Sequence, residues 1–127
     1  DKSHIKRCRM EKFTISFYET ASGARPAEEF LLELDLKMRA KMLRTIKLLA
    51  VNGNQLREPY SKELTHQIFE LRAKVGANIS RVLYFFVVGQ HIILTHGFIK
   101  KTQKTPAREI ERAKRYRQDY FERTDAP

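Results

Sequence analysis

Six positively charged residues stand in the last three apolar segments of the sequence, within patterns typical of β-strands. They are Arg72 and Lys74 in FELRAKV, Arg81 in ISRVLYF, and Lys100, Lys101 and Lys104 in HGFIKKTQKTP. Alternate residues of a strand share one face, so adjacent strands can bring these cations together. Arginine binds phosphate through a planar fork of donors and lysine adds a point charge, so this pattern favours a phosphate ligand.

Two histidines near these cations are candidates for proton transfer. His96 lies in the third apolar segment, and His66 precedes the first. A structural alternative stays open, since a lone histidine in a strand is more often a hydrogen-bonded structural residue, and Arg72 could pair with Glu70 or Glu109. The four histidines and the single cysteine show no metal-ligand spacing, so we expect no metal and no other cofactor.

The net charge of the chain favours an anionic macromolecule as its partner. Of 127 residues, 25 are Lys or Arg and 15 are Asp or Glu, which gives a formal charge of +10. A basic but merely soluble surface is the alternative, although solubility requires far less charge. No apolar run approaches the roughly 20 residues of a membrane span. The lone Cys8 fits a reducing compartment, so we expect a cytoplasmic protein.

Periodicity and turn residues predict four strands and three helices. Phe13 to Glu19 alternates as a first strand, and a helix with Pro26 in its first turn follows a cap at Ser22 or Gly23. A second helix runs from Asp35, its cap, to a stop at Asn52-Gly53. Its expected core face contains Leu36, Ala40, Leu43, Ile46 and Ala50, with its cations in solvent. Residues 54–64 are expected to form a loop before strands near 65–75, 79–88 and 91–101, and a last helix follows Pro106.

The predicted order is β-α-α-β-β-β-α, which indicates an α+β domain with a mostly antiparallel sheet. The first two helices should form a hairpin on one face of that sheet, with the helices segregated to one side. We assign residues 11–123 to this single domain. Residues 1–10 are expected to be a disordered leader, with Met10 a possible translation start, and 124–127 a tail.

The second half of the chain resembles the RelE/HigB-type toxins of bacterial type II toxin–antitoxin pairs, specifically their phage-derived HigB-like branch within the RelE/ParE superfamily. The residues that carry the resemblance are the FELR box, the RVLYFF strand and the HGFIKKTQKTP segment followed by a helix with an E-x-x-x-A pattern. The resemblance covers about residues 13–121 and is strongest from Ile68 onward. The order of elements in this family is similar to the order predicted above.

This resemblance implies a ribosome-dependent endoribonuclease that cuts mRNA in the ribosomal A site. The ribose 2′-OH attacks the adjacent phosphate without a metal, which requires a base, an acid and positive charge around the phosphate. By position, Arg72 and Arg81 are the best candidates to bind the scissile phosphate, with His96 and Lys100 as further catalytic candidates. The candidate residues for contacts with mRNA and rRNA are His66, Lys74, Lys101 and Lys104. None of Tyr84, Tyr116 or Tyr120 clearly matches the late tyrosine that several such toxins use.

Two other functions stay open on the same fold. A ParE-like toxin would inhibit DNA gyrase by binding, without nuclease chemistry. A non-enzymatic nucleic-acid-binding module would use the basic faces alone, although the sequence has no aromatic-interleaved strip and no recognition helix. As a toxin, the chain should be neutralised by a small helix-turn-helix antitoxin encoded beside it, in a hetero-oligomeric complex.

Overall fold

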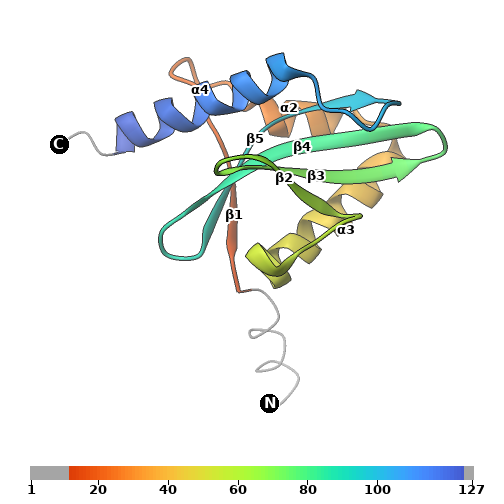
Figure 1. Cartoon of the computed structure of the whole chain (residues 1–127). Coiled ribbons are helices and arrows are strands. Elements are labelled where there is room, and N and C mark those ends of the chain that lie inside the picture. The colour runs from red at the N-terminus through yellow and green to blue at the C-terminus, as the bar shows by residue number, and fades with distance from the viewer. Residues whose placement is uncertain (1–11, 125–127) are drawn as a thin grey trace.

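The computed structural model describes residues 12–124, so the expected leader, with Met10 and Cys8, and the last three residues lie outside the described part. The described chain forms five strands, three α-helices and one short 3-10 turn (Figure 1). The strands are β1 Thr14–Phe17, β2 Ser61–Thr65, β3 Ile68–Val75, β4 Asn78–Val87 and β5 His91–Lys100. The helices are α2 Pro26–Glu33, α3 Leu36–Asn52 and α4 Ala107–Thr124, and the 3-10 turn is Gly53–Gln55.

All five strands belong to one sheet in the order β1-β5-β4-β3-β2. β2 to β5 form an antiparallel meander, and β1 joins the opposite edge parallel to β5. The mostly antiparallel α+β fold with a helical hairpin is therefore confirmed. The order of elements differs in one place, because Ser61–Thr65, expected within a loop, pairs with Ile68–Leu71 as a further edge strand. Its sequence SKELT has no apolar alternation that would have revealed it.

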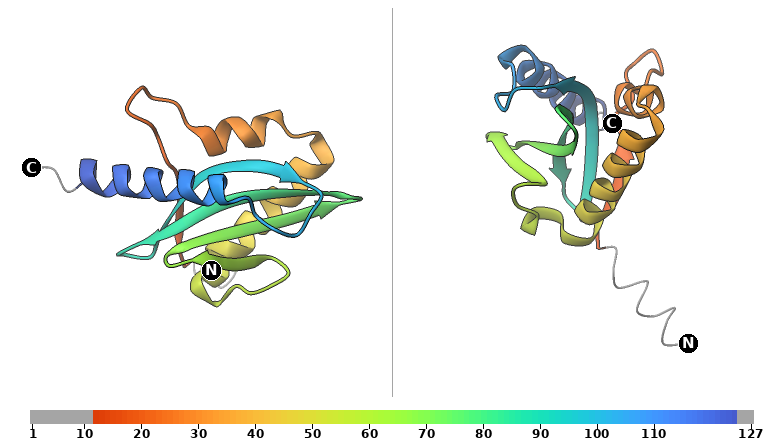
Figure 2. Two further views of the ribbon diagram at one scale, coloured as in Figure 1. Left: turned by 45° about the horizontal axis from the view of Figure 1, so that its top comes forward. Right: turned by 90° about the vertical axis from the view of Figure 1, so that its right-hand side faces the viewer.

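The sheet is covered on both faces. α2 and α3 pack against one face, where Met42, Leu49, Leu71, Val82 and Leu94 are fully buried. α4 lies on the opposite face of the sheet from α2 and α3 (Figure 2), and it packs there over Leu83, Phe85 and Ile93. The expectation that the helices gather on one side is therefore wrong for α4. Its aromatic residues Tyr116, Tyr120 and Phe121 cover the second apolar face, which water would otherwise contact.

The core face of α3 also differs from the prediction. Its buried residues are Met38, Met42, Thr45, Leu49 and Ala50. Leu36, Ala40 and Leu43, expected in the core, are exposed. Both sets of residues recur at helical spacing, so periodicity alone could not choose between two adjacent stripes of the same helix.

The helix ends are mostly those that the sequence indicates. The Asp35 carboxylate caps α3 by accepting from the Met38 N–H at 2.8 Å, and Gly53 with φ 53° follows its last residue. For α2, however, the cap position is Arg25 rather than Ser22 or Gly23. Within residues 12–124, no helix is both long and apolar enough to cross a membrane.

Candidate functional site

Strand register gathers four predicted site residues, all cations, in two adjacent rows at one end of the sheet face that α4 partly covers. Arg72 of β3 lies opposite Arg81 of β4, and Arg81 lies opposite Phe98 of β5. In the next row, Lys74 and Lys100 flank Ile79. Since α4 begins only at Ala107, after the bend that follows β5, these two rows lie near the end of the sheet where the Lys101–Pro106 loop starts. The predicted convergence of cations is therefore real at the level of the backbone.

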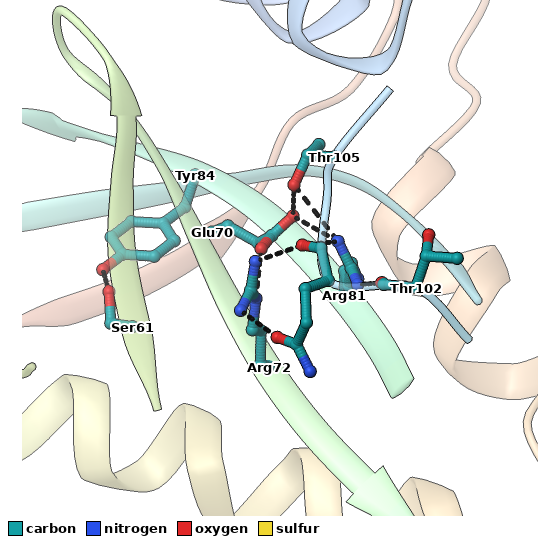
Figure 3. Close-up of polar contacts among 8 residues, drawn as sticks. Ser61, Glu70, Arg72, Arg81, Tyr84, Thr102 and Thr105 are labelled. Atoms are coloured by element: carbon teal, nitrogen blue, oxygen red, sulfur yellow. Dashed lines mark hydrogen bonds and ion pairs between the residues drawn. The ribbon is translucent and has the colours of Figure 1, made fainter. Parts of the chain in front are cut away.

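Both arginines share one buried carboxylate, that of Glu70. Arg72 Nε donates to Glu70 Oε1 at 2.5 Å, and Arg81 Nη1 lies 3.7 Å from Glu70 Oε2. The Thr105 hydroxyl donates to the same Oε2 at 2.5 Å. We call Glu70, Arg72, Arg81 and Thr105 the arginine network (Figure 3). It is a charged cluster with two cations for one anion, and it connects β3 and β4 to the loop after β5.

Arg81 is the inner member of the arginine network and anchors the loop. Its side chain is 0% exposed. Arg81 Nη1 donates to the Gln103 carbonyl at 3.0 Å and to Thr105 Oγ1 at 3.2 Å, and Nη2 donates to the Thr102 carbonyl. Burial lowers the pKa of Arg81, and the charge of Arg72 acts in the same direction against that of Glu70. In this conformation Arg81 therefore binds protein carbonyls where the sequence predicted a bound phosphate.

Arg72 is the outer member of the arginine network and lines an open cleft. Its side chain is 15% exposed, and its Nη1 and Nη2 donate to the side-chain and main-chain oxygens of Gln103 at 3.0 and 2.8 Å. The cleft has a volume of about 460 Å³ and lies beside the part of β3 that extends past Ser61, the first residue of β2. We call it the edge cleft. Its lining residues are Lys41, Thr45, Glu58, Pro59, Tyr60, Arg72, Ala73, Lys74, Ile79 and Gln103.

The lysines named from the sequence surround this region to different extents. Lys74 is exposed and lines the edge cleft, and its main-chain carbonyl accepts from Lys41 Nζ at 2.5 Å. Lys101 and Lys104 are exposed in the loop that Arg81 anchors, whereas Lys100, the last residue of β5, is half-buried. The loop therefore presents two exposed cations near the guanidinium of Arg72, which Glu70 and Gln103 hold in place.

His96 lies on the same sheet face but in the wall between β5 and α4. It is 1% exposed, with Nε2 at 3.1 Å from Glu109 Oε1 and Nδ1 at 3.0 Å from Thr95 Oγ1. Burial lowers the pKa of His96 to about 4, with Arg112 adding to the effect and Glu109 opposing it. A neutral ring with both nitrogens facing protein atoms fits the hydrogen-bonded structural role, and no substrate atom can reach it in this conformation.

His66 is not brought to the arginine network. It is exposed in the turn between β2 and β3, where its Nε2 lies 3.1 Å from Gln67 Nε2. Arg72 lies six positions further along the chain and within β3, which begins at Ile68, so an extended path of roughly 20 Å at 3.3 Å per residue runs between the two. Instead, His66 lines a separate groove with Lys114 and Arg117 of α4. Proximity in sequence therefore did not mean proximity in the site.

The tyrosines considered from the sequence lie away from the edge cleft. Tyr84 faces α3 and is buried, its hydroxyl 2.5 Å from Ser61 Oγ, and burial raises its pKa to about 12. Tyr116 stacks on Tyr18, and Tyr120 packs on Phe85. None of the three lines the edge cleft.

Sequence reasoning missed Glu58, Tyr60 and Lys41 as candidate site residues. Glu58 and Tyr60 belong to the segment expected to be a loop, and Lys41 to a helix face assigned to solvent. Tyr60 is 44% exposed, and its main-chain carbonyl accepts from the Arg72 N–H at 2.9 Å. Among the described lining residues of the edge cleft, Glu58 is the only carboxylate. A usable signal was present in the sequence, namely an acidic and an aromatic residue in REPY shortly before the strand with Arg72.

The edge cleft thus combines cations, one carboxylate and one exposed aromatic ring. Such a set can bind a phosphate, accept a proton and stack on a base or another flat group. In the part of the chain that the structure covers, no three His, Cys, Asp or Glu side chains gather as metal ligands.

Comparison with known proteins identifies the family. Residues 29–118 match the family model described as Phage derived protein Gp49-like (DUF891). This match extends from α2 to α4 and includes the whole arginine network and the edge cleft. No curated protein matches the sequence. The chain therefore belongs to the phage-derived Gp49-like family, which lies within the RelE/toxin-like superfamily of type II toxin–antitoxin proteins.

Proposed function

We propose that this protein is the toxin of a toxin–antitoxin pair and cleaves mRNA in the ribosomal A site. The ribose 2′-OH attacks the adjacent phosphate, which leaves a 2′,3′-cyclic phosphate and a 5′-OH without the help of a metal. The family is toxin-like, and the resemblance to the HigB-like branch supplies the reaction. The observation that carries the proposal is Arg72, which is held by the buried carboxylate of Glu70 at the mouth of the edge cleft, between Lys74 and the Lys101–Lys104 loop.

Arg72 is the residue that we propose to contact the scissile phosphate. Its Nε is held by Glu70, and its two terminal nitrogens, now on Gln103, point at the loop boundary of the cleft. A guanidinium oriented in advance stabilises the charge that builds up on the phosphorane oxygens. Lys74 and Lys100 add positive charge from the neighbouring row, and Lys101 and Lys104 contact flanking phosphates of mRNA or rRNA.

Arg81 has a positioning role in this proposal. It fixes the backbone of the Thr102–Thr105 segment and completes the charge around Glu70, so it acts on the phosphate through Arg72 and the loop. His96 supports the packing of α4 against β5 and does not transfer a proton. His66, at the far end of β3, is available only for a peripheral RNA contact.

Glu58 is the proposed base for the attacking 2′-OH. A carboxylate suits this task when it lies in the same cleft as the cations that bind the phosphate. Lys41 and Lys74 line the same cleft and are the candidate proton donors to the leaving 5′-oxygen. Tyr60, with an exposed ring, is placed to stack on a base beside the cut.

The proposed action sets the partners and the compartment. The substrate is mRNA in the A site, with rRNA as a further contact surface, so the protein acts in the cytoplasm. A helix-turn-helix antitoxin encoded next to the toxin neutralises it in a hetero-oligomeric complex.

The test is to map mRNA 5′ ends after brief induction of the chain without its antitoxin. We expect growth arrest and cuts within translated codons. Arg72→Ala should lower the cleavage rate by about 10²- to 10³-fold, the cost of removing one donor to a transition-state anion. Glu58→Gln should lower it by about 10²-fold or more, the contribution of a general base.

The matched control is Arg25→Ala, because Arg25 also pairs with a carboxylate, that of Glu19 at 3.1 Å, but lies outside the edge cleft. It should cleave like the wild type. Intact mRNA with DNA damage would instead support a ParE-like gyrase inhibitor. RNA binding without cleavage or growth arrest would support the non-enzymatic module. Wild-type cleavage by Arg72→Ala would refute the assignment of this site.

A further inference from the structure

The outward face of α3 carries leucines and cations but no acid. Eight residues of this helix point to solvent in two adjacent stripes. They are Leu36, Lys37, Ala40, Lys41, Leu43, Arg44, Lys47 and Leu48. Leu36, Leu43 and Leu48 are 79%, 48% and 37% exposed, and α3 contains no Asp or Glu. We call this surface the outer face of α3. Figure 2 shows α3 on the outside of the domain, with no other helix over it.

The outer face of α3 is continuous with the edge cleft. A second cleft, of about 610 Å³, is lined by Lys41, Leu43, Arg44, Thr45, Lys47, Leu48 and Tyr60. Lys41, Thr45 and Tyr60 line both clefts. Together the two clefts form one groove, which we call the α3 groove. It leads from Leu43 and Leu48, past Tyr60, to Arg72 and Lys74.

Charge and apolar surface in the α3 groove indicate a protein occupant. Among its described lining residues, Glu58 is the only acid, against Lys41, Arg44, Lys47, Arg72 and Lys74. A phosphate backbone would match these cations but would make no favourable contact with the exposed leucines. Tyr60 is the only aromatic residue among the described residues that line the groove, so the groove offers few rings for bases to stack on. A segment with acidic residues on one side and apolar residues on the other matches both features.

We propose that the α3 groove binds an acidic amphipathic segment of the neutralising partner protein, and that this segment covers the edge cleft. This inference rests on the proposed function for the identity of the partner. α3 spans 17 residues, or about 25 Å, which is long enough to hold a partner helix of four to five turns along its leucines. Carboxylates of the bound segment pair with Lys41 and Arg44 and, beyond Tyr60, with Lys74 and Arg72. The partner thus neutralises the toxin by occupying the cations that the RNA phosphates need.

The experiment uses the full chain and the purified product of the reading frame adjacent to its gene. Leu43→Glu and Leu48→Glu place a negative charge in the groove and leave Arg72, Lys74 and the loop lysines unchanged. Each should weaken binding of the partner at least tenfold, because an apolar anchor is lost and an acid faces acids. The matched control is Val88→Glu, since Val88 is 99% exposed in the β4–β5 turn and lines neither cleft. It should bind the partner like the wild type.

Growth arrest and mRNA cleavage without the partner are measured on the same variants. Retained toxicity with weakened rescue by the partner supports the docking surface. Wild-type affinity of both leucine variants for the partner, or no binding of the partner to the wild type, overturns it. So does a loss of ribosome binding with unchanged partner affinity, because the groove would then be an RNA surface. If the wild type causes no arrest but its affinity for the partner still depends on the leucines, the docking surface stands and the proposed nuclease function fails.

Discussion

Replacing Arg81 by Met should show that the main role of this arginine is to hold the Thr102–Thr105 segment in place. The substitution keeps an unbranched apolar stem but removes the guanidinium, which is 0% exposed. The Thr102 carbonyl and Thr105 Oγ1 then lose the donor that Arg81 supplies, while the Gln103 carbonyl keeps Arg72 as its donor. Removing one partner of a buried ion pair typically costs about 3–5 kcal/mol. Because Glu70 keeps Arg72 and Thr105 as donors, we expect the lower end, a loss of about 3 kcal/mol in the free energy of unfolding.

Urea unfolding measures this loss. With a slope of about 1.5 kcal/mol/M, the midpoint of Arg81→Met should fall by about 2 M. Arg72→Met is the matched comparison and should cost only about 1–2 kcal/mol, because Arg81 and Thr105 still hold the Glu70 carboxylate. Thr105→Val removes a hydrogen bond to a charged group and should cost about 1.5 kcal/mol. It keeps the experiment informative if Arg81→Met does not fold.

Hydrogen exchange reports the local part of the effect. Amides of residues 101–105 should exchange faster in Arg81→Met than in Arg72→Met, since Arg81 alone holds the Thr102 carbonyl among the described contacts. An Arg81→Met variant that is no less stable than Arg72→Met, with unchanged exchange in this loop, would refute the assignment of Arg81 as the anchor.

Two further predictions concern His96 and the loop lysines. The folded protein lowers the pKa of His96 from near 6.5 to about 4, so between these values the unfolded chain binds more protons and stability falls as the pH falls. The contribution near pH 5 is up to about 1.4 kcal/mol per pH unit. In urea unfolding at pH 7 and pH 5, His96→Gln should remove this contribution to the pH dependence of stability. Replacing the exposed His66 by Gln should leave it in place. Equal pH dependence in His96→Gln and the wild type would contradict the buried neutral ring. Replacing Lys101 and Lys104 together by Ala should reduce the slope of log affinity against log salt for single-stranded RNA by about 1.4, or about 0.7 for each lost phosphate contact. Lys114→Ala on α4 is the control. An unchanged slope in the double variant would mean that the two lysines are ordinary solvated residues without phosphate contacts.

Much of the fold could be predicted because its signals are local. Alternation marked β1, apolar segments marked β3, β4 and β5, and turn residues marked the hairpins between the last three. Asp35 and Gly53 marked the ends of α3, since a cap and a left-handed glycine act within one helical turn. β2 was missed because an edge strand of five mostly polar residues is defined by its pairing with β3 and has little pattern of its own.

The candidate site was also predicted only in part, because local signals place side chains on a strand face but do not show what covers them. The sequence correctly put Glu70, Arg72 and Lys74 on one face of β3, and the register then aligned Arg72 with Arg81. It could not tell which arginine would reach solvent, because that depends on the loop carbonyls that fold back over Arg81 from more than 20 residues away. Main-chain oxygens have no signature in a sequence. Tyr60 and Glu58 were missed because only the folded loop brings them to the edge of β3.

By itself, the sequence determined the fold class, the strand faces of the cations and the resemblance to toxins. These depend on side-chain period, turn chemistry and composition, which act over a few residues or over the chain as a whole. Only the tertiary structure decided that Arg81 is an anchor, that His96 lies in the wall under α4, and that Leu36, Leu43 and Leu48 face outward. Each of these depends on which surface is covered by another element. Which surface is covered depends on packing between segments that are distant in the sequence. Local periodicity is compatible with more than one buried face of the same helix or strand.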